Sequence, residues 1–357
     1  MKIISVIGAR PQFVKAAMVS RQLAAIGQQE QLIHTGQHFE HQMSAVFFEQ
    51  LALPQPAHYL GISGGSHGAM TGRMLEALET VLVAEKPDWM LVYGDTNSTL
   101  AAALAAAKLQ IPIAHVEAGM RSFNRAMPEE INRVLTDHLA SLLLVTSQEP
   151  VRLLAAEGIT RGVHCVGDVM YDAVLAALPA AQKSGMREQL GLAGRFGLLT
   201  LHRAENTDDP VRLRVWLSEL EQLSRHLPLL FPVHPRTRQA IARALPGWAP
   251  AGIRLIEPLG YLEMLDLQQQ AALVLTDSGG VQKEALYLGV PCLTLRRETE
   301  WTETLASGWN QLLGDRPQEL VTVAQAILAQ PPAGPPPPLY GDGSASRRIA
   351  EILAAAG

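Results

Sequence analysis

The chain has 357 residues and a formal net charge of −5, from 29 Lys and Arg against 34 Asp and Glu. Hydrophobic residues make up 48% and charged residues 18%, which excludes disorder for the bulk of the chain and is typical of a globular protein. The acidic balance disfavours a nucleic-acid surface, and at roughly 100–200 residues per domain the length predicts two domains.

Short apolar runs alternate with longer amphipathic segments along the chain. Helices are expected from about Pro11 and over 98–109, and candidate strands cover residues 2–7, 31–34, 88–93, 111–115, 142–146, 163–166, 196–201, 229–233, 254–256, 273–276 and 292–295. Such alternation predicts parallel sheets with right-handed crossovers. About a dozen strands are too many for one open sheet, so we expect an α/β fold of two doubly wound, Rossmann-like domains.

The break between the two halves is expected near residues 167–178. We therefore predict a first domain over residues 1–170 and a second over residues 171–342. Residues 331–338 contain six prolines, which excludes regular structure there. This segment is expected to connect the second domain to a last amphipathic helix within residues 343–357.

The two cysteines, Cys165 and Cys292, form neither a disulfide framework nor a metal knuckle, and we expect both to be small core residues on strands. The apolar run at the N-terminus is too short for a signal peptide, and the longest apolar stretch, residues 100–107, is too short for a membrane span. We therefore expect a reduced, cytoplasmic protein without a membrane partner.

Polar residues follow the predicted strands in both halves. Ligands of open parallel sheets bind beyond the carboxyl ends of the strands, so these residues are candidates for a site. We expect carboxylates on one wall of an interdomain cleft and anion-binding groups mainly on the other. The candidates are Arg10, Lys15, Gln37, His38, Asp95 and Glu117 in the first half, and His202, Arg203, His234, Arg236 and Asp277-Ser278-Gly279-Gly280 in the second.

Each acid of the first half has a structural alternative. Asp95 precedes a helix and could serve as its N-cap. Glu117 stands at a buried strand end without an obvious partner, which favours a working group. Glu129 and Glu130 open a helix, where the dipole alone accounts for acids. Only one of the two can face the cleft, and Arg133 lies on the same helix face as Glu129, four residues later.

In the second half, the glycine pair of Asp277-Ser278-Gly279-Gly280 follows a strand and opens a helix. Free backbone amides at such a position make a phosphate seat, although a plain turn is the alternative. The cations beside His202 and His234 strengthen the phosphate interpretation. Glu284, five residues after Gly279, either accepts hydrogen bonds from ribose hydroxyls or lies on a solvated helix face.

Several motifs of cofactor-dependent enzymes are missing. Gly8-Ala9-Arg10-Pro11 stands where a nicotinamide fingerprint, Gly-x-Gly-x-x-Gly, would follow the first strand. The sequence also lacks a Walker loop and the Cys and His spacing of a metal site. We expect neither a nicotinamide nor a metal.

The motifs together resemble those of one family, the non-hydrolysing UDP-N-acetylglucosamine 2-epimerases, over nearly the whole chain. The residues that carry the resemblance are Gly8-Ala9-Arg10-Pro11 with Lys15, Gly94-Asp95-Thr96, His115-Val116-Glu117-Ala118-Gly119-Met120-Arg121, Pro128-Glu129-Glu130-Ile131-Asn132-Arg133, His202-Arg203 and Asp277-Ser278-Gly279-Gly280.

The resemblance implies a glycosyltransferase-B-like fold, with a UDP-sugar cleft between the domains and the last helix returning to the first domain. It also implies a homodimer that uses no metal or nicotinamide. By the resemblance, the catalytic set falls on Asp95, Glu117, Glu129 and His202. The nucleotide- and phosphate-binding positions fall on Arg10, Lys15, Arg133, His234, Ser278, Gly279, Gly280 and Glu284.

The implied activity is the interconversion of UDP-N-acetylglucosamine and UDP-N-acetylmannosamine, which supplies surface polysaccharide precursors. C2 of the sugar has no neighbouring carbonyl to make its proton acidic. Its inversion therefore requires either transient oxidation or elimination of UDP, and elimination needs no nicotinamide. A carboxylate removes the C2 proton while cations stabilise the departing UDP, and 2-acetamidoglucal is the intermediate. A more distant alternative is a retaining glycosyltransferase of the same fold.

Two departures from the family pattern affect regulation and substrate. Many members are activated by a second UDP-N-acetylglucosamine molecule, whose Gln-His pair is matched by Gln37 and His38. A further glutamine is replaced by Glu40, and residues 62–68 lack an expected arginine. The motifs at 8–13, 167–172 and 298–301 resemble the branch that includes epimerases of UDP-2,3-diacetamido-2,3-dideoxyglucuronate, which is the alternative substrate.

Overall fold

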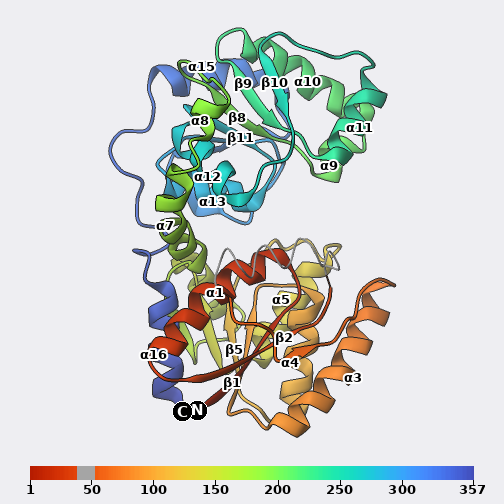
Figure 1. The fold of residues 1–357 in the computed structure, drawn as a ribbon, viewed down its shortest axis with the longest axis vertical. Helices are drawn as coiled ribbons and strands as arrows, with labels where there is room; N and C mark the ends of the chain where they lie inside the picture. The colour runs from red at the N-terminus through yellow and green to blue at the C-terminus, as the bar shows by residue number, and fades with distance from the viewer. Residues whose placement is uncertain (38–52) are drawn as a thin grey trace. The chain divides into compact units, whose positions relative to one another are not determined.

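The computed structural model describes residues 1–37 and 53–357, without the side chain of Arg10. Two compact units are formed, one by Met1–Ala173 with Pro338–Gly357 and the other by Val174–Pro337 (Figure 1). In each unit, helices cover both faces of a parallel sheet. The predicted α/β class with two Rossmann-like sheets is therefore confirmed.

The sheet of the first unit has seven parallel strands among the described residues, in the order β3-β2-β1-β4-β5-β6-β7. Side chains of the inner strand β1, Lys2–Ile7, alternate between two cores, as a strand covered on both faces requires. Ile3 and Ile7 pack in one core and Ile4 and Val6 in the other. The strands are β1 Lys2–Ile7, β2 Gln29–His34, β3 His58–Tyr59, β4 Trp89–Tyr93, β5 Ile113–Val116, β6 Leu142–Val145 and β7 Val163–Cys165.

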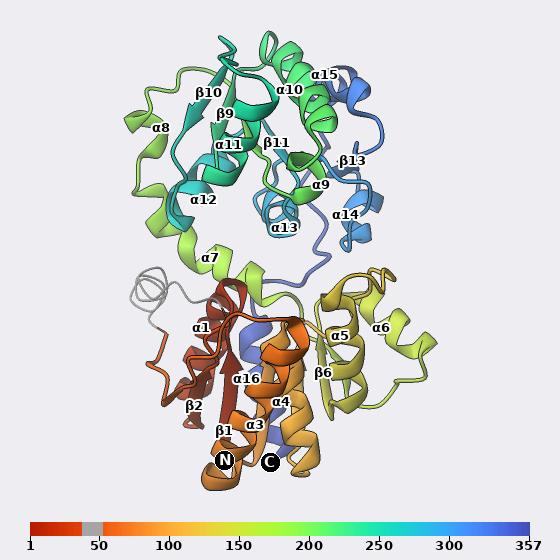
Figure 2. The same ribbon diagram turned by 90° about the vertical axis from the view of Figure 1, so that its right-hand side faces the viewer.

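The helices of the first unit form a layer on each face of this sheet (Figure 2). They are α1 Arg10–Ala25, α3 His67–Glu85, α4 Asn97–Lys108, α5 Pro128–Leu139, α6 Gln148–Ala156 and α16 Ala345–Ala356, while α7 Val169–Gln182 begins in this unit and continues into the other. The last helix, α16, packs against α1. Its start is held by Asp172, whose carboxylate accepts hydrogen bonds from the backbone N–H groups of Ala345 and Ser346.

The second unit has a parallel sheet in the order β10-β9-β8-β11-β12-β13. Its strands are β8 Gly197–Thr200, β9 Leu229–Pro232, β10 Ile253–Ile256, β11 Leu273–Thr276, β12 Cys292–Thr294 and β13 Asn310–Leu312. Its helices are α8 Met186–Gln189, α9 Ala204–Thr207, α10 Pro210–Ser224, α11 Pro235–Ala244, α12 Tyr261–Gln270, α13 Gly279–Tyr287, α14 Thr302–Ala306 and α15 Leu320–Ala329, with a 3-10 turn over Pro317–Glu319.

Some local expectations are corrected by the structure. The strands β3 and β13 were not predicted, because one has only two residues and the other begins with two polar ones. Cys292 is a buried strand residue as expected, but Cys165 is exposed. Cys165 lies on β7, which pairs with β6 and stands last in the sheet order, so its side chain is not enclosed. Among the described residues, no helix is long and apolar enough to cross a membrane.

Candidate active site

Two acids follow neighbouring strands of the first sheet. Asp95 comes two residues after β4 and Glu117 directly after β5, and these strands pair in parallel with Tyr93 opposite Val116. A Cβ added to Gly94, which precedes Asp95, would lie 3.5 Å from the Glu117 carboxylate. The structure thus brings the two predicted carboxylates to one edge of the sheet.

Asp95 does not cap the helix that follows it. Thr96 is the N-cap of α4, and its side chain accepts the hydrogen bond from the backbone N–H of Thr99. The carboxylate of Asp95 instead forms an ion pair with Arg133 of α5, and its side chain is 34% exposed. The capping alternative is therefore wrong, and the partly exposed carboxylate is held by Arg133 instead.

Glu117 has a partner that the sequence did not reveal. The Lys15 ammonium, on the second turn of α1, forms an ion pair with its carboxylate, and both side chains are largely buried. The backbone of Glu117 adopts a φ of +68°, in the left-handed region that non-glycine residues seldom occupy. Its N–H donates to the carbonyl of Leu144, which holds this strained turn in place.

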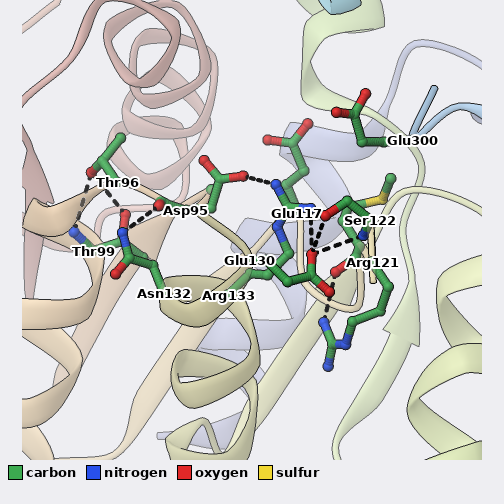
Figure 3. Close-up of polar contacts among 12 residues, drawn as sticks. Asp95, Thr96, Thr99, Glu117, Arg121, Ser122, Glu130, Asn132, Arg133 and Glu300 are labelled. Atoms are coloured by element: carbon green, nitrogen blue, oxygen red, sulfur yellow. Dashed lines mark hydrogen bonds and ion pairs between the residues drawn. The ribbon is translucent and has the colours of Figure 1, made fainter. Parts of the chain in front are cut away.

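At the start of α5, the two adjacent acids have different surroundings. Glu129 is exposed, whereas Glu130 is buried and forms the ion pair with Arg133, at 3.1 Å. The acid that Arg133 contacts on its own helix is therefore Glu130, which is buried, and not the exposed Glu129. Figure 3 shows Arg133 with Asp95 and Glu130, beside Glu117.

A buried cluster of His115, Arg121 and Asp137 lies beside these residues. Sequence reasoning did not identify this cluster as functional. His115 on β5 contacts Asp137 of α5 at 2.7 Å, and Arg121 contacts the other oxygen of Asp137 at 2.6 Å. Burial alone would raise the pKa of Asp137, but the hydrogen bond from His115 and the charge of Arg121 hold it below its usual value. Asp137 lies on a regular amphipathic helix, so the sequence carried no signal for this role.

The remaining candidates of the first unit are only partly described. Arg10 begins α1, but its side chain lies outside the described part of the structure, as does the whole of His38. The side-chain oxygen of Gln37 accepts hydrogen bonds from the backbone N–H and the hydroxyl of Ser98, at 3.0 and 2.7 Å. Gln37 is thereby tied to the first turn of α4.

In the second unit, Asp277 follows β11 and organises the end of the neighbouring strand β8. Its fully buried carboxylate accepts hydrogen bonds from the backbone N–H groups of His202 and Arg203 and from the Asn206 amide. Nδ1 of His202 lies 3.1 Å from the same carboxylate, while the side chain is 47% exposed. Burial raises the pKa of Asp277, but the contacts with His202, Arg203 and Asn206 outweigh it and lower the pKa.

The glycine pair begins α13 as predicted. Ser278 is the N-cap, its side chain makes no capping bond, and Gly279 and Gly280 form the first turn. This arrangement leaves backbone N–H groups at the start of a nine-residue helix, the geometry that suits a phosphate group. Further along, Glu284 is half-buried, and burial raises its pKa to about 7 despite the charge of Lys283.

His234 and the arginine beside it have separate roles. Nδ1 of His234 accepts the backbone N–H of Arg236 at 3.2 Å, so His234 caps α11 and its ring is exposed. The Arg236 guanidinium forms an ion pair with Asp208 at 2.7 Å. Within residues 1–37 and 53–357, no group of three or more His, Cys, Asp or Glu residues is arranged to hold a metal ion.

Known proteins of one family match this sequence along almost the entire chain. The family model for UDP-N-acetylglucosamine 2-epimerase matches residues 21–354. The chain is 50% identical to the UDP-2,3-diacetamido-2,3-dideoxy-D-glucuronate 2-epimerase of Pseudomonas aeruginosa, over 99% of both proteins. It is 41% identical to the UDP-N-acetylglucosamine 2-epimerase of Methanocaldococcus jannaschii, again over 99% of both.

Solved structures give the same result. The crystal structure of the Methanocaldococcus jannaschii enzyme in complex with UDP-GlcNAc and UDP matches with a TM-score of 0.88, covering 99% of this chain and 100% of that one at 41% identity. The Neisseria meningitidis enzyme bound to UDP-GlcNAc matches with a TM-score of 0.90, at 30% identity and the same coverage. The predicted glycosyltransferase-B-like fold class is thus confirmed. The chain belongs to the UDP-N-acetylglucosamine 2-epimerase family and is a UDP-sugar 2-epimerase, an isomerase.

Proposed function

We propose that the protein interconverts UDP-N-acetylglucosamine and UDP-N-acetylmannosamine by eliminating and re-adding UDP. A carboxylate removes the C2 proton, and the electron pair of the C2–H bond forms the C1–C2 double bond. The C1–O bond breaks at the same time, and UDP leaves with its electron pair. Re-addition of UDP at C1 with protonation of C2 from the opposite face gives the epimer.

The observation that carries this proposal is the placement of Asp95 and Glu117 after adjacent parallel strands, each paired with a cation from a helix. Inversion requires an acid/base group on each face of C2, and a carboxylate can remove a proton on one face and return one on the other. We assign the two faces to members of the set Asp95, Glu117 and Glu129, with His202 as a further catalytic group.

The leaving UDP needs positive partners. The backbone amides of Gly279 and Gly280 at the start of α13 and the hydroxyl of Ser278 are suited to the diphosphate, and Glu284 to the ribose hydroxyls. The remaining proposed contacts with UDP are Arg10, Lys15, Arg133 and His234. In this proposal, the groups of both units act on one bound UDP-sugar. We also propose that the active protein is a homodimer, and light scattering on the purified protein tests this oligomeric state.

A second candidate substrate is UDP-2,3-diacetamido-2,3-dideoxyglucuronate, and the 50% identity to the Pseudomonas aeruginosa enzyme favours it. The same elimination chemistry serves both sugars, because they differ at C3 and C6 and not at the reacting C1 and C2. Only a direct comparison of turnover with each UDP-sugar distinguishes the two candidate substrates.

A proton NMR time course in deuterated buffer with each UDP-sugar tests the proposal. The expected result is deuterium at C2 and a mixture of C2 epimers that remain attached to UDP. Release of free N-acetylmannosamine identifies a hydrolysing enzyme, and an unchanged C2 configuration identifies a transferase. A UDP-sugar that binds without any C2 exchange indicates a binding protein and overturns the proposal.

A further inference from the structure

One acid beside the proposed catalytic set is buried and fully engaged. Glu130 is 3% exposed, and its carboxylate accepts hydrogen bonds from the backbone N–H and hydroxyl of Ser122, both at 2.8 Å, and from the N–H of Phe123 at 3.0 Å. Burial raises the pKa of Glu130, but the Ser122 and Phe123 bonds and the charge of Arg133 outweigh it and lower the pKa. Glu130 is therefore a fixed negative charge with no surface left for a substrate proton.

The same carboxylate shares a guanidinium with Asp95. Nη1 of Arg133 contacts Glu130 at 3.1 Å, and Nη2 of Arg133 forms the ion pair with Asp95 (Figure 3). One positive charge thus lies between two negative ones, and Arg133 is itself buried. The strength and direction of its attraction for Asp95 depend on Glu130, because a charged pair in a poorly hydrated site is weakly screened.

Glu130 also holds the loop that joins two proposed catalytic acids. This loop runs from Glu117 at the end of β5 to Glu129 at the start of α5. Its middle residue Phe123 has a φ of +58° and a side chain that is 72% exposed, so its own side-chain packing does little to fix this backbone. The hydrogen bonds from Ser122 and Phe123 to Glu130 hold it instead.

We propose that Glu130 is a positioning residue for C2 epimerisation. It orients Arg133 toward Asp95, offsets part of the guanidinium charge, and fixes the loop between Glu117 and Glu129. This inference rests on the proposed function, because it assigns Asp95 a role in the proton transfers. Glu130 itself does not touch the sugar.

The first test compares Glu130→Gln and Glu130→Asp by C2 deuterium exchange and by kcat and KM. A neutral amide has one acceptor oxygen in place of two and no charge for Arg133. We expect kcat to fall about 10- to 100-fold in Glu130→Gln, with KM within about threefold. Glu130→Asp retains the charge and should recover part of the lost kcat.

Glu157→Gln is the matched control, because Glu157 binds Arg121 in the same loop but has no contact with Arg133 among the described residues. The kcat of Glu157→Gln is expected to stay within about threefold of the wild-type value.

The second test distinguishes positioning from a purely structural role. The low-pH limb of kcat should move to lower pH in Glu130→Gln, because Arg133 then serves Asp95 alone. The other charged or titratable groups beside Gly94, which precedes Asp95, are Lys15 of α1, Glu117 after β5 and His115 of β5, and all three are unchanged in the variant. The loss of C2 exchange caused by Glu130→Gln should also be smaller when Asp95 is already replaced by Asn, because only the effect on the loop at Ser122 and Phe123 then remains.

The outcomes are separable from those of the proposed function. Wild-type protein that exchanges no C2 proton overturns the proposed function and with it this inference. Wild-type exchange with an unaltered kcat in Glu130→Gln overturns the inference alone. The same holds if kcat falls only in proportion to the folded fraction, measured by circular dichroism, while the pH limb stays in place.

Discussion

Both ring nitrogens of His115 form hydrogen bonds: Nδ1 lies 2.7 Å from Oδ1 of Asp137, and Nε2 donates to the carbonyl oxygen of Gly94 across 2.7 Å. A carbonyl oxygen only accepts, so Nε2 carries a proton. The His115 ring therefore ties the turn before Asp95 to the strand before Glu117. The relative placement of the two proposed catalytic acids depends on this buried contact.

Replacing Asp137 with Asn should destabilise the protein by about 3–5 kcal/mol at pH 7, because the buried Arg121 guanidinium loses its charged partner and the His115 ring loses its carboxylate contact. The pKa of Asp137 is lowered in the folded state, so its contribution is present above the ordinary carboxyl pKa and is lost as the pH falls through the folded value. Urea unfolding at pH 7 and at about pH 2.5, below the ordinary carboxyl pKa, measures both effects. Glu149→Gln, which breaks an exposed pair with Arg152, should change stability by less than about 1 kcal/mol.

Glu117→Gln should nearly abolish turnover while UDP affinity stays within a few-fold. The amide retains the size of the side chain but cannot accept the C2 proton at neutral pH. Deuterium exchange at C2 measures the first effect and calorimetric titration with UDP the second. An unchanged kcat would remove Glu117 from the mechanism.

Asp277→Asn should lower kcat about 10- to 100-fold in protein that is still folded. The amide replaces one acceptor oxygen by a donor that faces the N–H groups of His202 and Arg203, so the end of β8 shifts and His202 loses its orientation. Asp209→Asn is the control, since Asp209 caps α10 at the surface. Equal kcat values for the two variants would show that Asp277 does not position His202.

Glu284 should make stability depend on pH in an unusual direction for an acid. Burial raises its pKa to about 7, against an ordinary value of 4.5, so the folded chain holds an extra proton between these values. Stability contributed by this group is therefore lost as the pH rises from about 5 to 7. Glu284→Gln should show a flatter dependence in urea unfolding at pH 5, 6, 7 and 8.

The same group gives a prediction for ligand binding. If the ionised carboxylate accepts the ribose hydroxyls, UDP should bind wild type more tightly at pH 8 than at pH 6, beyond any change seen in Glu284→Gln. The variant corrects for the titration of UDP itself. Parallel pH dependence in both proteins, measured by calorimetry, argues against a ribose contact at Glu284.

The sequence was sufficient to predict most strands and the acids at their ends. Alternating strands and helices define parallel sheets, and the carboxyl ends of such strands collect functional groups, so Asp95 and Glu117 could be selected from one sequence. The cations that pair with these acids could not be predicted from the sequence. Lys15 and Glu117 are 102 positions apart, and only the completed sheet brings them together.

The choice between Glu129 and Glu130 shows the same limit. Both acids suit the first turn of a helix, and helical spacing alone placed Arg133 with Glu129. The path of the loop at Ser122 and Phe123 decides which acid is buried, and that path depends on left-handed backbone at Phe123, for which an aromatic residue gives no signal.

The helix α16 completes the core of the first unit through Ile349, Ala350 and Leu353, although all of Val174–Pro337 lies between it and the rest of that unit in the chain. During synthesis on the ribosome, the second unit is therefore finished before the first has received its closing helix. The first unit, which carries Asp95 and Glu117, cannot complete its core until residues 345–356 are synthesised. Until then, the apolar face of α1 that α16 covers is exposed.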